Sequence, residues 1–220
     1  MKQKLYVLFI GVAILAIAGC DEGSDNNTTQ TSYTTSILSD STYDGDIEQT
    51  SQNSFTITQG MSSSVQSVFA GVDPTTLTEF RAFLDFPLGG ADGVPYKAII
   101  DSAYLDIYIN SIRPNAGTIP ILIELVSFQP PSLVSTDFDR TVQKALLSKS
   151  ISPPISSADV GSNISIDVTA LMVEAQSKGL TDFQVRILED FVRDPGIIEI
   201  NDSTGTNRSS LAPQLTVTYH

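Results

Sequence analysis

The sequence predicts an all-β domain, a two-sheet antiparallel β-sandwich with one short helix. Many short segments alternate apolar and polar residues as half-buried strands do, residues that favour turns separate them, and one segment has the features of a helix. Strands and helices do not alternate along the chain, which disfavours a parallel α/β sheet. About 180 residues follow the N-terminal segments, enough for one well-buried domain without disulfides.

The clearest predicted strand covers residues 99–110. Every second residue from Ala103 to Ile109 is apolar, and the residues between them are polar or tyrosine. Further strands are expected at 54–58, 65–69, 80–86, 119–128, 163–168, 183–189, 197–200 and 211–219. Turn residues separate them at Gly89-Gly90, Asp92-Gly93, Asn115-Ala-Gly117, Pro130-Pro131, Pro153-Pro154 and Asp194-Pro-Gly196.

One helix is predicted at residues 170–178. Thr169 can cap its first turn, Lys178 suits the C-terminal end of the helix dipole, and Gly179 can end the helix. The apolar stretch within residues 137–150 fits a short helix and a pair of strands equally, so both assignments stay open.

The N-terminal segment has the features of a bacterial lipoprotein signal peptide. Lys2 and Lys4 are followed by about fourteen uncharged, mostly apolar residues, fewer than the roughly 20 needed to span a membrane. Ile17-Ala18-Gly19-Cys20 resembles the lipobox, whose cysteine receives a diacylglyceryl group and becomes the first mature residue. An ordinary signal peptide with a chance cysteine and a transmembrane anchor are the alternatives. The expected organisation is a signal peptide at 1–19, the lipidated cysteine with a flexible polar tether at 20–38, and the sandwich at 39–220.

Lipidation of Cys20 would hold the domain outside the cytoplasm, anchored to a bacterial membrane, and inner and outer membranes both stay open. Without Lys2 and Lys4 the chain has 10 basic and 25 acidic residues, a net charge of −15. Such a charge repels nucleic acid and anionic head groups. We therefore expect contact with the membrane through the lipid anchor and no nucleic-acid partner.

Cysteine and histidine usage excludes several kinds of catalytic site. Cys20 is the only cysteine, so its lipidation leaves no thiol for a disulfide, a zinc site or a nucleophile. The only histidine is His220, and a terminal residue is expected to be held too poorly for a Ser-His-Asp triad or a metal site. We therefore expect that the domain is not an enzyme and needs no cofactor. Binding of a structural calcium ion by oxygen ligands is the alternative that stays open.

Four motifs occur in a fixed order along the chain. They are Arg81-Ala-Phe-Leu-Asp-Phe-Pro-Leu88, Ile100-Asp-Ser-Ala-Tyr-Leu-Asp-Ile-Tyr108, Ile166-Asp-Val-Thr-Ala-Leu171 and Ala212-Pro-Gln-Leu-Thr-Val-Thr-Tyr219. Over roughly residues 42–220 this order resembles the DNRLRE-type extracellular domains, which are similar to carbohydrate-binding modules. The resemblance implies a jelly-roll-like sandwich that serves as a surface module. Residues 201–208 depart from the segment that names the family, and the chain has no tryptophan to stack on sugar rings.

Tyr104, Asp106 and Tyr108 form the candidate ligand-binding site. All three fall on the outer face of the predicted strand, where the two rings lie about 13 Å apart at the rise of an extended chain. Aromatic faces at this spacing can hold successive sugar rings, while the carboxylate accepts hydrogen bonds from hydroxyl groups. The alternative is that loops or a neighbouring sheet cover the rings, because tyrosine is common in strands.

Asp40, Asp44, Asp46 and Glu48 form an acidic group at the start of the predicted domain. They could supply some of the about six to eight oxygen ligands that calcium takes, although their spacing differs from that of an EF-hand loop. A solvated acidic edge is the alternative.

Glu189, Asp190 and Asp194, near Arg186 and Arg193, form a second acidic group. Two carboxyl groups about 5–9.5 Å apart across a cleft would suit glycoside hydrolysis. An acidic domain also offers such pairs by chance.

These observations favour a lipid-anchored extracytoplasmic binding module, glycan-binding or adhesive at the cell surface. The alternative is a structural or interaction protein of the cell envelope that recognises a protein partner. A carboxylate-based glycosidase is the third hypothesis.

Replacing Cys20 with serine should abolish metabolic labelling with palmitate and release the protein from the membrane fraction, because serine has no thiol to acylate. Asp21→Asn, next to the cysteine, should keep the label. Persistent labelling of the Cys20→Ser protein would contradict the lipoprotein assignment.

Overall fold

The structure is a computed structural model that describes residues 30–50, 54–128, 132–190 and 195–220. Its strands are β1 (Tyr33–Leu38), β2 (Gly45–Gln49), β3 (Phe55–Gln59), β4 (Ser67–Val72), β5 (Glu79–Pro87), β6 (Ile100–Arg113), β7 (Thr118–Ile119), β8 (Ile121–Val126), β9 (Leu147–Ser150), β10 (Ile155–Ser156), β11 (Asn163–Asp167), β12 (Asp182–Glu189), β13 (Ile197–Asn201) and β14 (Gln214–Tyr219). Its helices are α1 (Ser135–Phe138), α2 (Thr169–Ser177), α3 (Arg208–Leu211) and the 3-10 turn η1 (Ser157–Asp159).

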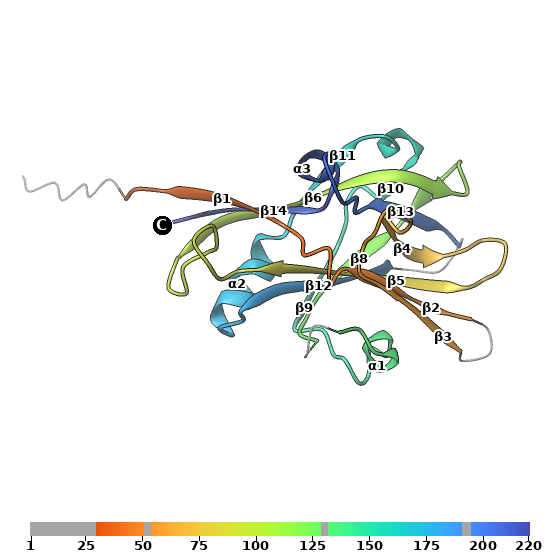
Figure 1. Ribbon diagram of the computed structural model, residues 1–220, viewed down its shortest axis with the longest axis horizontal. Helices are drawn as coiled ribbons and strands as arrows, with labels where there is room; N and C mark the ends of the chain where they lie inside the picture. Colours follow the sequence, from red (N-terminus) through yellow and green to blue (C-terminus); the bar gives the residue numbers. More distant parts are fainter. Residues whose placement is uncertain (1–29, 51–53, 129–131, 191–194) are drawn as a thin grey trace, which may run out of the picture. The chain divides into compact units, whose positions relative to one another are not determined.

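Twelve of the described strands form one hydrogen-bonded sheet, and every pairing is antiparallel (Figure 1). The longest path runs β1-β14-β6-β13-β4-β5-β12-β8-β9. β11 also pairs with β6, β2 pairs with both β5 and β3, and β7 pairs with β10 in a separate two-stranded sheet. The predicted antiparallel, mostly β fold is confirmed.

The strands do not separate into the two sheets that the sequence predicts. β6 is 14 residues long, and Ile100–Asp106 pair with β14 while Ile109–Arg113 pair with β13. The hydrogen-bonded ladder therefore continues through β6, so that the strands form one large curled sheet. The physical reason is that one long strand, β6, forms hydrogen bonds with strands of both halves of the sheet.

The predicted alternation along β6 is confirmed. Its inward residues Ala103, Leu105, Ile107 and Ile109 are fully buried, and the residues between them are partly exposed. They belong to the main apolar core, which α2 enters through Leu171, Met172 and Ala175. The same strand thus provides an inner wall for the core and an outer face that is partly open to solvent.

The folded domain begins before residue 39, within the segment assigned to the tether. β1 pairs with β14 along its whole length. The Thr34 and Ser36 hydroxyls also lie 3.1 and 3.2 Å from those of Thr218 and Thr216. The polar composition suits an exposed edge strand, because hydroxyl pairs and the backbone ladder replace apolar burial.

Three helices are present among the described residues, where one was expected. α1 and α3 are single turns of four residues, and α2 is the predicted helix. Thr169 does not cap α2 but is its first residue, and its backbone N–H donates to the Asp167 carboxylate at 2.9 Å. Gly179 follows the helix with the expected positive φ of 65°. The undecided segment at 137–150 contains both kinds of structure, the end of α1 and the strand β9.

The face of β5, β8 and β12 that is turned away from the main core is also buried. A second apolar cluster covers it, formed by Ile47, Phe83, Val126, Phe128, Leu133 and Phe138. Two of these residues, Leu133 and Phe138, come from the segment around α1. Because both faces are covered, β8 is buried at all six positions and cannot alternate.

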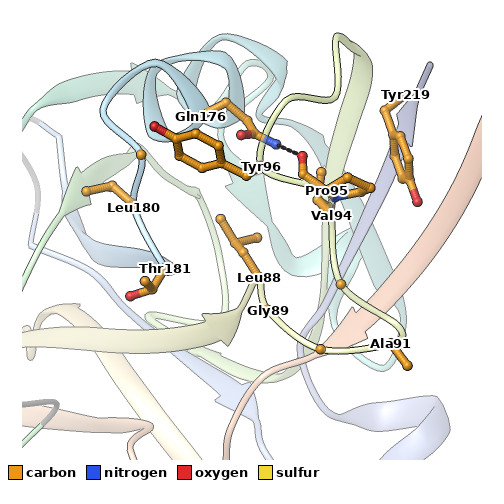
Figure 2. Close-up of a pocket in the computed structure, with 13 residues that line it drawn as sticks. Leu88, Gly89, Ala91, Val94, Pro95, Tyr96, Gln176, Leu180, Thr181 and Tyr219 are labelled. Atoms are coloured by element: carbon orange, nitrogen blue, oxygen red, sulfur yellow. Dashed lines mark hydrogen bonds between the residues drawn. The ribbon is translucent and has the colours of Figure 1, made fainter.

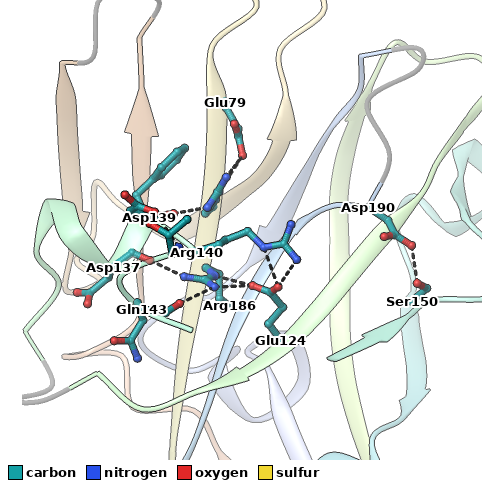
Figure 3. A network of polar contacts seen from close by, with 12 residues as sticks. Glu79, Glu124, Asp137, Asp139, Arg140, Gln143, Ser150, Arg186 and Asp190 are labelled. Atoms are coloured by element: carbon teal, nitrogen blue, oxygen red, sulfur yellow. Dashed lines mark hydrogen bonds and ion pairs between the residues drawn. The ribbon is translucent and has the colours of Figure 1, made fainter. Parts of the chain in front are cut away.

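A buried ion pair fastens the segment around α1 to the sheet (Figure 3). The Arg186 side chain is fully buried and donates from Nε to Glu124 Oε2 at 2.7 Å. Its Nη1 and Nη2 donate to the carbonyls of Asp137 and Gln143 at 2.6 and 3.0 Å. Arg140 Nη2 lies 2.5 Å from the other oxygen of Glu124. Arg186 was grouped by sequence with Glu189 and Asp190, but its carboxylate partner is Glu124.

Replacing Arg186 with methionine should lower the free energy of unfolding by about 3–5 kcal/mol, because it leaves two carbonyls and part of a carboxylate buried without their donor. The matched control is Arg113→Met, which removes an ion pair with Asp73 from an arginine that is 56% exposed and should cost about 0–1 kcal/mol. Urea denaturation measures both. Equal losses in the two variants would contradict this account.

Candidate functional site

Tyr104, Asp106 and Tyr108 lie on one face of β6, as the sequence predicts. Tyr104 is 43% exposed, and the other two side chains are partly exposed. β11 runs beside them, with Asp167 opposite Tyr104 in the register. The sequence could not identify β11 as this neighbour, because about fifty residues separate the two strands.

The three side chains do not line one common hollow. Tyr104 lines a hollow of about 550 Å³ between β6, β9, β10 and β11. Asp106 lines a separate, smaller hollow of about 400 Å³ with residues of the α3 region. Tyr108 lies beside the turn at Gly161, where a Cβ atom would be 3.9 Å from its hydroxyl.

We use the name Tyr104 hollow for the first of these cavities. Its walls are Tyr104, Lys149, Ile151, Ser152, Pro153, Ile155, Asp159, Ile164, Ser165, Ile166 and Asp167. Isoleucines and the tyrosine ring make part of the surface apolar, and a lysine, two aspartates and two serines make the rest polar. This volume lies within the range of about 300–1,000 Å³ that small-molecule sites have.

The Asp167 carboxylate is the most strongly fixed charge of the Tyr104 hollow. Its Oδ1 accepts hydrogen bonds from the Thr169 hydroxyl at 2.6 Å and backbone N–H at 2.9 Å. Its Oδ2 lies 3.0 Å from Lys149 Nζ. These contacts, with the Thr169 hydroxyl first, lower the pKa of Asp167 to about 2. The Thr169 hydroxyl also accepts the Ala103 N–H at 3.0 Å, which ties the carboxylate to β6.

A third hollow of about 500 Å³, the Tyr96 hollow, lies where the 88–96 loop meets the end of α2. Figure 2 shows Tyr96 and Tyr219 on either side of Val94 and Pro95, and Gln176 Nε2 donates to the Pro95 carbonyl at 3.0 Å. Tyr96 is 73% exposed. Sequence reasoning missed this hollow, and its only signal was the pair of glycine turns in the loop.

The acidic group at the start of the domain does not converge on one point. Asp44 Oδ1 accepts the Asp85 N–H at 2.8 Å, and Asp46 Oδ2 accepts the Phe69 N–H at 3.1 Å. Burial raises the pKa of Asp46 to about 7. No group of three or more acidic, histidine or cysteine side chains is placed to hold a metal in the part of the chain that the structure describes.

The second acidic group is only partly described. Asp190 accepts a hydrogen bond from the Ser150 hydroxyl (Figure 3), and Glu189 is buried. Arg193 and Asp194 lie outside the described residues. Of the three acids in this group, the described residues therefore include only Glu189 and Asp190.

His220 is held better than its terminal position suggested. Its backbone exchanges two hydrogen bonds with Ile99, and its Nδ1 lies 2.8 Å from Asp101 Oδ1. The expectation of a poorly held imidazole was wrong, because this antiparallel pairing continues past the end of β14. The Ser32 hydroxyl donates to the other oxygen of Asp101 at 3.1 Å, so these three residues are not connected in the order of a catalytic triad.

Cys20 lies outside the described residues. No helix in the described ranges is long and apolar enough to cross a membrane. A scan against models of known protein families found no match, and a search of curated proteins found no significantly similar sequence.

Asp167 should titrate near pH 2 in a carbon-detected NMR experiment, well below its ordinary value of 3.8. Because the fold favours the ionised form, the stability from this carboxylate is present above pH 3.8 and is lost as the pH falls through about 2. Thr169→Val should raise the pKa more than Lys149→Met, since Thr169 makes the stronger contact. A wild-type midpoint at 3.8 would contradict the geometry.

Proposed function

We propose that this protein is a lipid-anchored extracytoplasmic module that binds glycans in the Tyr104 hollow. The observation that carries the proposal is the combination of groups along this one cavity: a partly exposed tyrosine ring, an ion pair and hydroxyl groups. A sugar ring presents apolar C–H faces and hydroxyls at its edge, so it needs both kinds of contact. Asp106 and Tyr108 continue the same strand face and would contact further sugar units.

The electrostatics of the hollow favour binding over catalysis. A glycosidase needs a carboxylic acid whose pKa is raised, so that it can protonate the leaving group. The pKa of Asp167 is lowered to about 2, which is the opposite direction. Asp159 Oδ2 accepts hydrogen bonds from the backbone and hydroxyl of Ser156 at 2.7 and 3.1 Å. Both carboxylates therefore suit fixed acceptors for sugar hydroxyls.

The net charge of the protein indicates which class of polysaccharide it would bind. A net charge of −15 on the mature chain repels acidic polysaccharides at long range. The single lysine of the hollow is already paired with Asp167. A neutral polysaccharide is therefore the ligand class that this domain suits best.

The proposal includes the jelly-roll-like sandwich that the DNRLRE-type resemblance implies. The four motifs fall on β5, on β6, on the junction of β11 with α2, and on β14. Inward residues from both halves of the curled sheet belong to one apolar core, which is the feature that a sandwich requires. The lipid on Cys20 would leave the domain outside the membrane with its binding face free.

A protein partner in the cell envelope is the second candidate function. The observation in its favour is the exposed apolar surface at the 88–99 segment, where Tyr96 and Ile99 are 73% and 60% exposed. Aromatic residues are enriched in protein interfaces. The Tyr96 hollow would then be the contact surface.

Tyr104→Ala should weaken binding to a neutral polysaccharide by about tenfold or more, because it removes the aromatic face of the hollow; that loss equals about 1.4 kcal/mol. A glycan array with the full chain identifies the ligand, and isothermal titration measures the affinity. The matched control is Tyr96→Ala, which removes a more exposed tyrosine outside the Tyr104 hollow and should leave the affinity unchanged.

Two results would overturn this proposal. One is a wild-type protein that binds no polysaccharide on the array. The other is a loss of affinity in Tyr96→Ala with none in Tyr104→Ala, which would move the site to the Tyr96 hollow.

A further inference from the structure

Two buried carboxyl groups meet where the start of the domain contacts its end. Asp44 precedes β2 and Asp202 follows β13, and both are 0% exposed. Ser39 and Ser203 lie beside them at 3% and 4% exposure. These four residues are called the Asp44–Asp202 site. Sequence reasoning grouped Asp44 with its chain neighbours and did not connect it with Asp202.

Each carboxyl group of the Asp44–Asp202 site has one satisfied oxygen. Asp44 Oδ1 accepts the Asp85 N–H at 2.8 Å, and Asp202 Oδ1 accepts from Arg208 Nη1 at 2.9 Å. Asp44 Oδ2, Asp202 Oδ2 and the hydroxyl oxygens of Ser39 and Ser203 are buried and have no well-aligned hydrogen-bond donor within the described residues, and the two carboxyl groups lie within hydrogen-bonding reach of each other. Leaving a buried polar group unpaired costs about 1–3 kcal/mol, so these oxygens need a further partner, which is either a proton shared by the two carboxyl groups or a cation.

The two carboxyl groups are close enough to influence each other. Burial first, and then the charge of Asp202, raises the pKa of Asp44 well above its ordinary value. Burial also raises the pKa of Asp202. The Ser39 hydroxyl lies near both carboxyl groups and acts to lower their pKa, although it makes no well-aligned hydrogen bond. Two acids and a hydroxyl therefore face one small volume.

When both carboxyl groups are ionised, the protein balances only one of their two charges. Arg208 is the one basic side chain that contacts it in the described ranges, and it pairs with Asp202. The same guanidinium donates to the carbonyls of Ser39 and Ser203. One positive group thus faces two buried carboxylates.

We propose that Asp44 and Asp202, with the hydroxyl of Ser39 and the adjacent Ser203, bind one calcium ion. All the free atoms are oxygens, which hard cations prefer, and calcium accepts irregular sets of carboxylate, hydroxyl, carbonyl and water ligands. Magnesium demands near-octahedral geometry and keeps several of its water ligands. A buried site with four protein oxygens therefore suits magnesium less well than calcium.

The bound ion would join two distant parts of the chain. Ser39 and Asp44 lie between β1 and β2, whereas Asp202 and Ser203 lie between β13 and α3. The described chain contains no cysteine, so a disulfide cannot make this connection. Affinities of extracellular calcium modules are about 10⁻⁴–10⁻³ M, and we expect this range here. This site is independent of the glycan proposal.

The experiment starts from the purified full chain in detergent, treated with EDTA and dialysed. Adding about 5 mM calcium should raise the melting temperature by about 3–6 °C, and isothermal titration should show one ion per chain. Asp44→Asn and Asp202→Asn should lose the shift, because each removes a charged ligand. Asp139→Asn, which changes an exposed aspartate elsewhere, should keep it.

A second variant covers the case in which the aspartate variants do not fold. Ser39→Ala keeps both charges and should weaken calcium binding severalfold, while Ser36→Ala on β1 should leave it unchanged. No calcium heat and no shift in the wild-type protein would overturn the proposal. An equal shift with magnesium, or with sodium chloride at the same ionic strength, would overturn it too.

Discussion

The arrangement of the domain depends on the length and alternation of β6. Its 14 residues pair with β14, β11 and β13, so two parts of the sheet share one strand. The period of two sends four residues into the core and three candidate binding residues outwards. A slip of one residue would exchange these sets, which ties the stability of the core to the identity of the outer face.

A buried polar network performs a different task on the face of β5, β8 and β12 that is turned away from the main core. The Arg186 guanidinium needs acceptors because it is fully buried, and it finds them in Glu124 and in two carbonyls of the segment around α1. These directional contacts fix where the segment lies, while the apolar residues beneath it supply most of the burial. Such a network accounts for a fully buried arginine between the apolar residues Val185 and Ile187 of β12.

Each proposed site also brings together residues from segments that are far apart in the chain. Asp167 acquires its fixed charge from Thr169 and Lys149, and it reaches Tyr104 only through the pairing of β11 with β6. The Asp44–Asp202 site joins residues from opposite ends of the domain. The calcium ion that we propose at this site would connect the two segments without a disulfide.

The sequence by itself determined the antiparallel strands, the helix α2 and the outward face of Tyr104, Asp106 and Tyr108, because these depend on local periodicity and turn chemistry. It did not determine that one sheet curls through β6, that residues 33–38 form a strand, or that the three candidates line different hollows. It also grouped Arg186 with Glu189 and Asp190 and did not identify its partner Glu124. Those features depend on which strands meet, and contacts between residues far apart in the chain leave no local pattern. Only the tertiary structure could decide them.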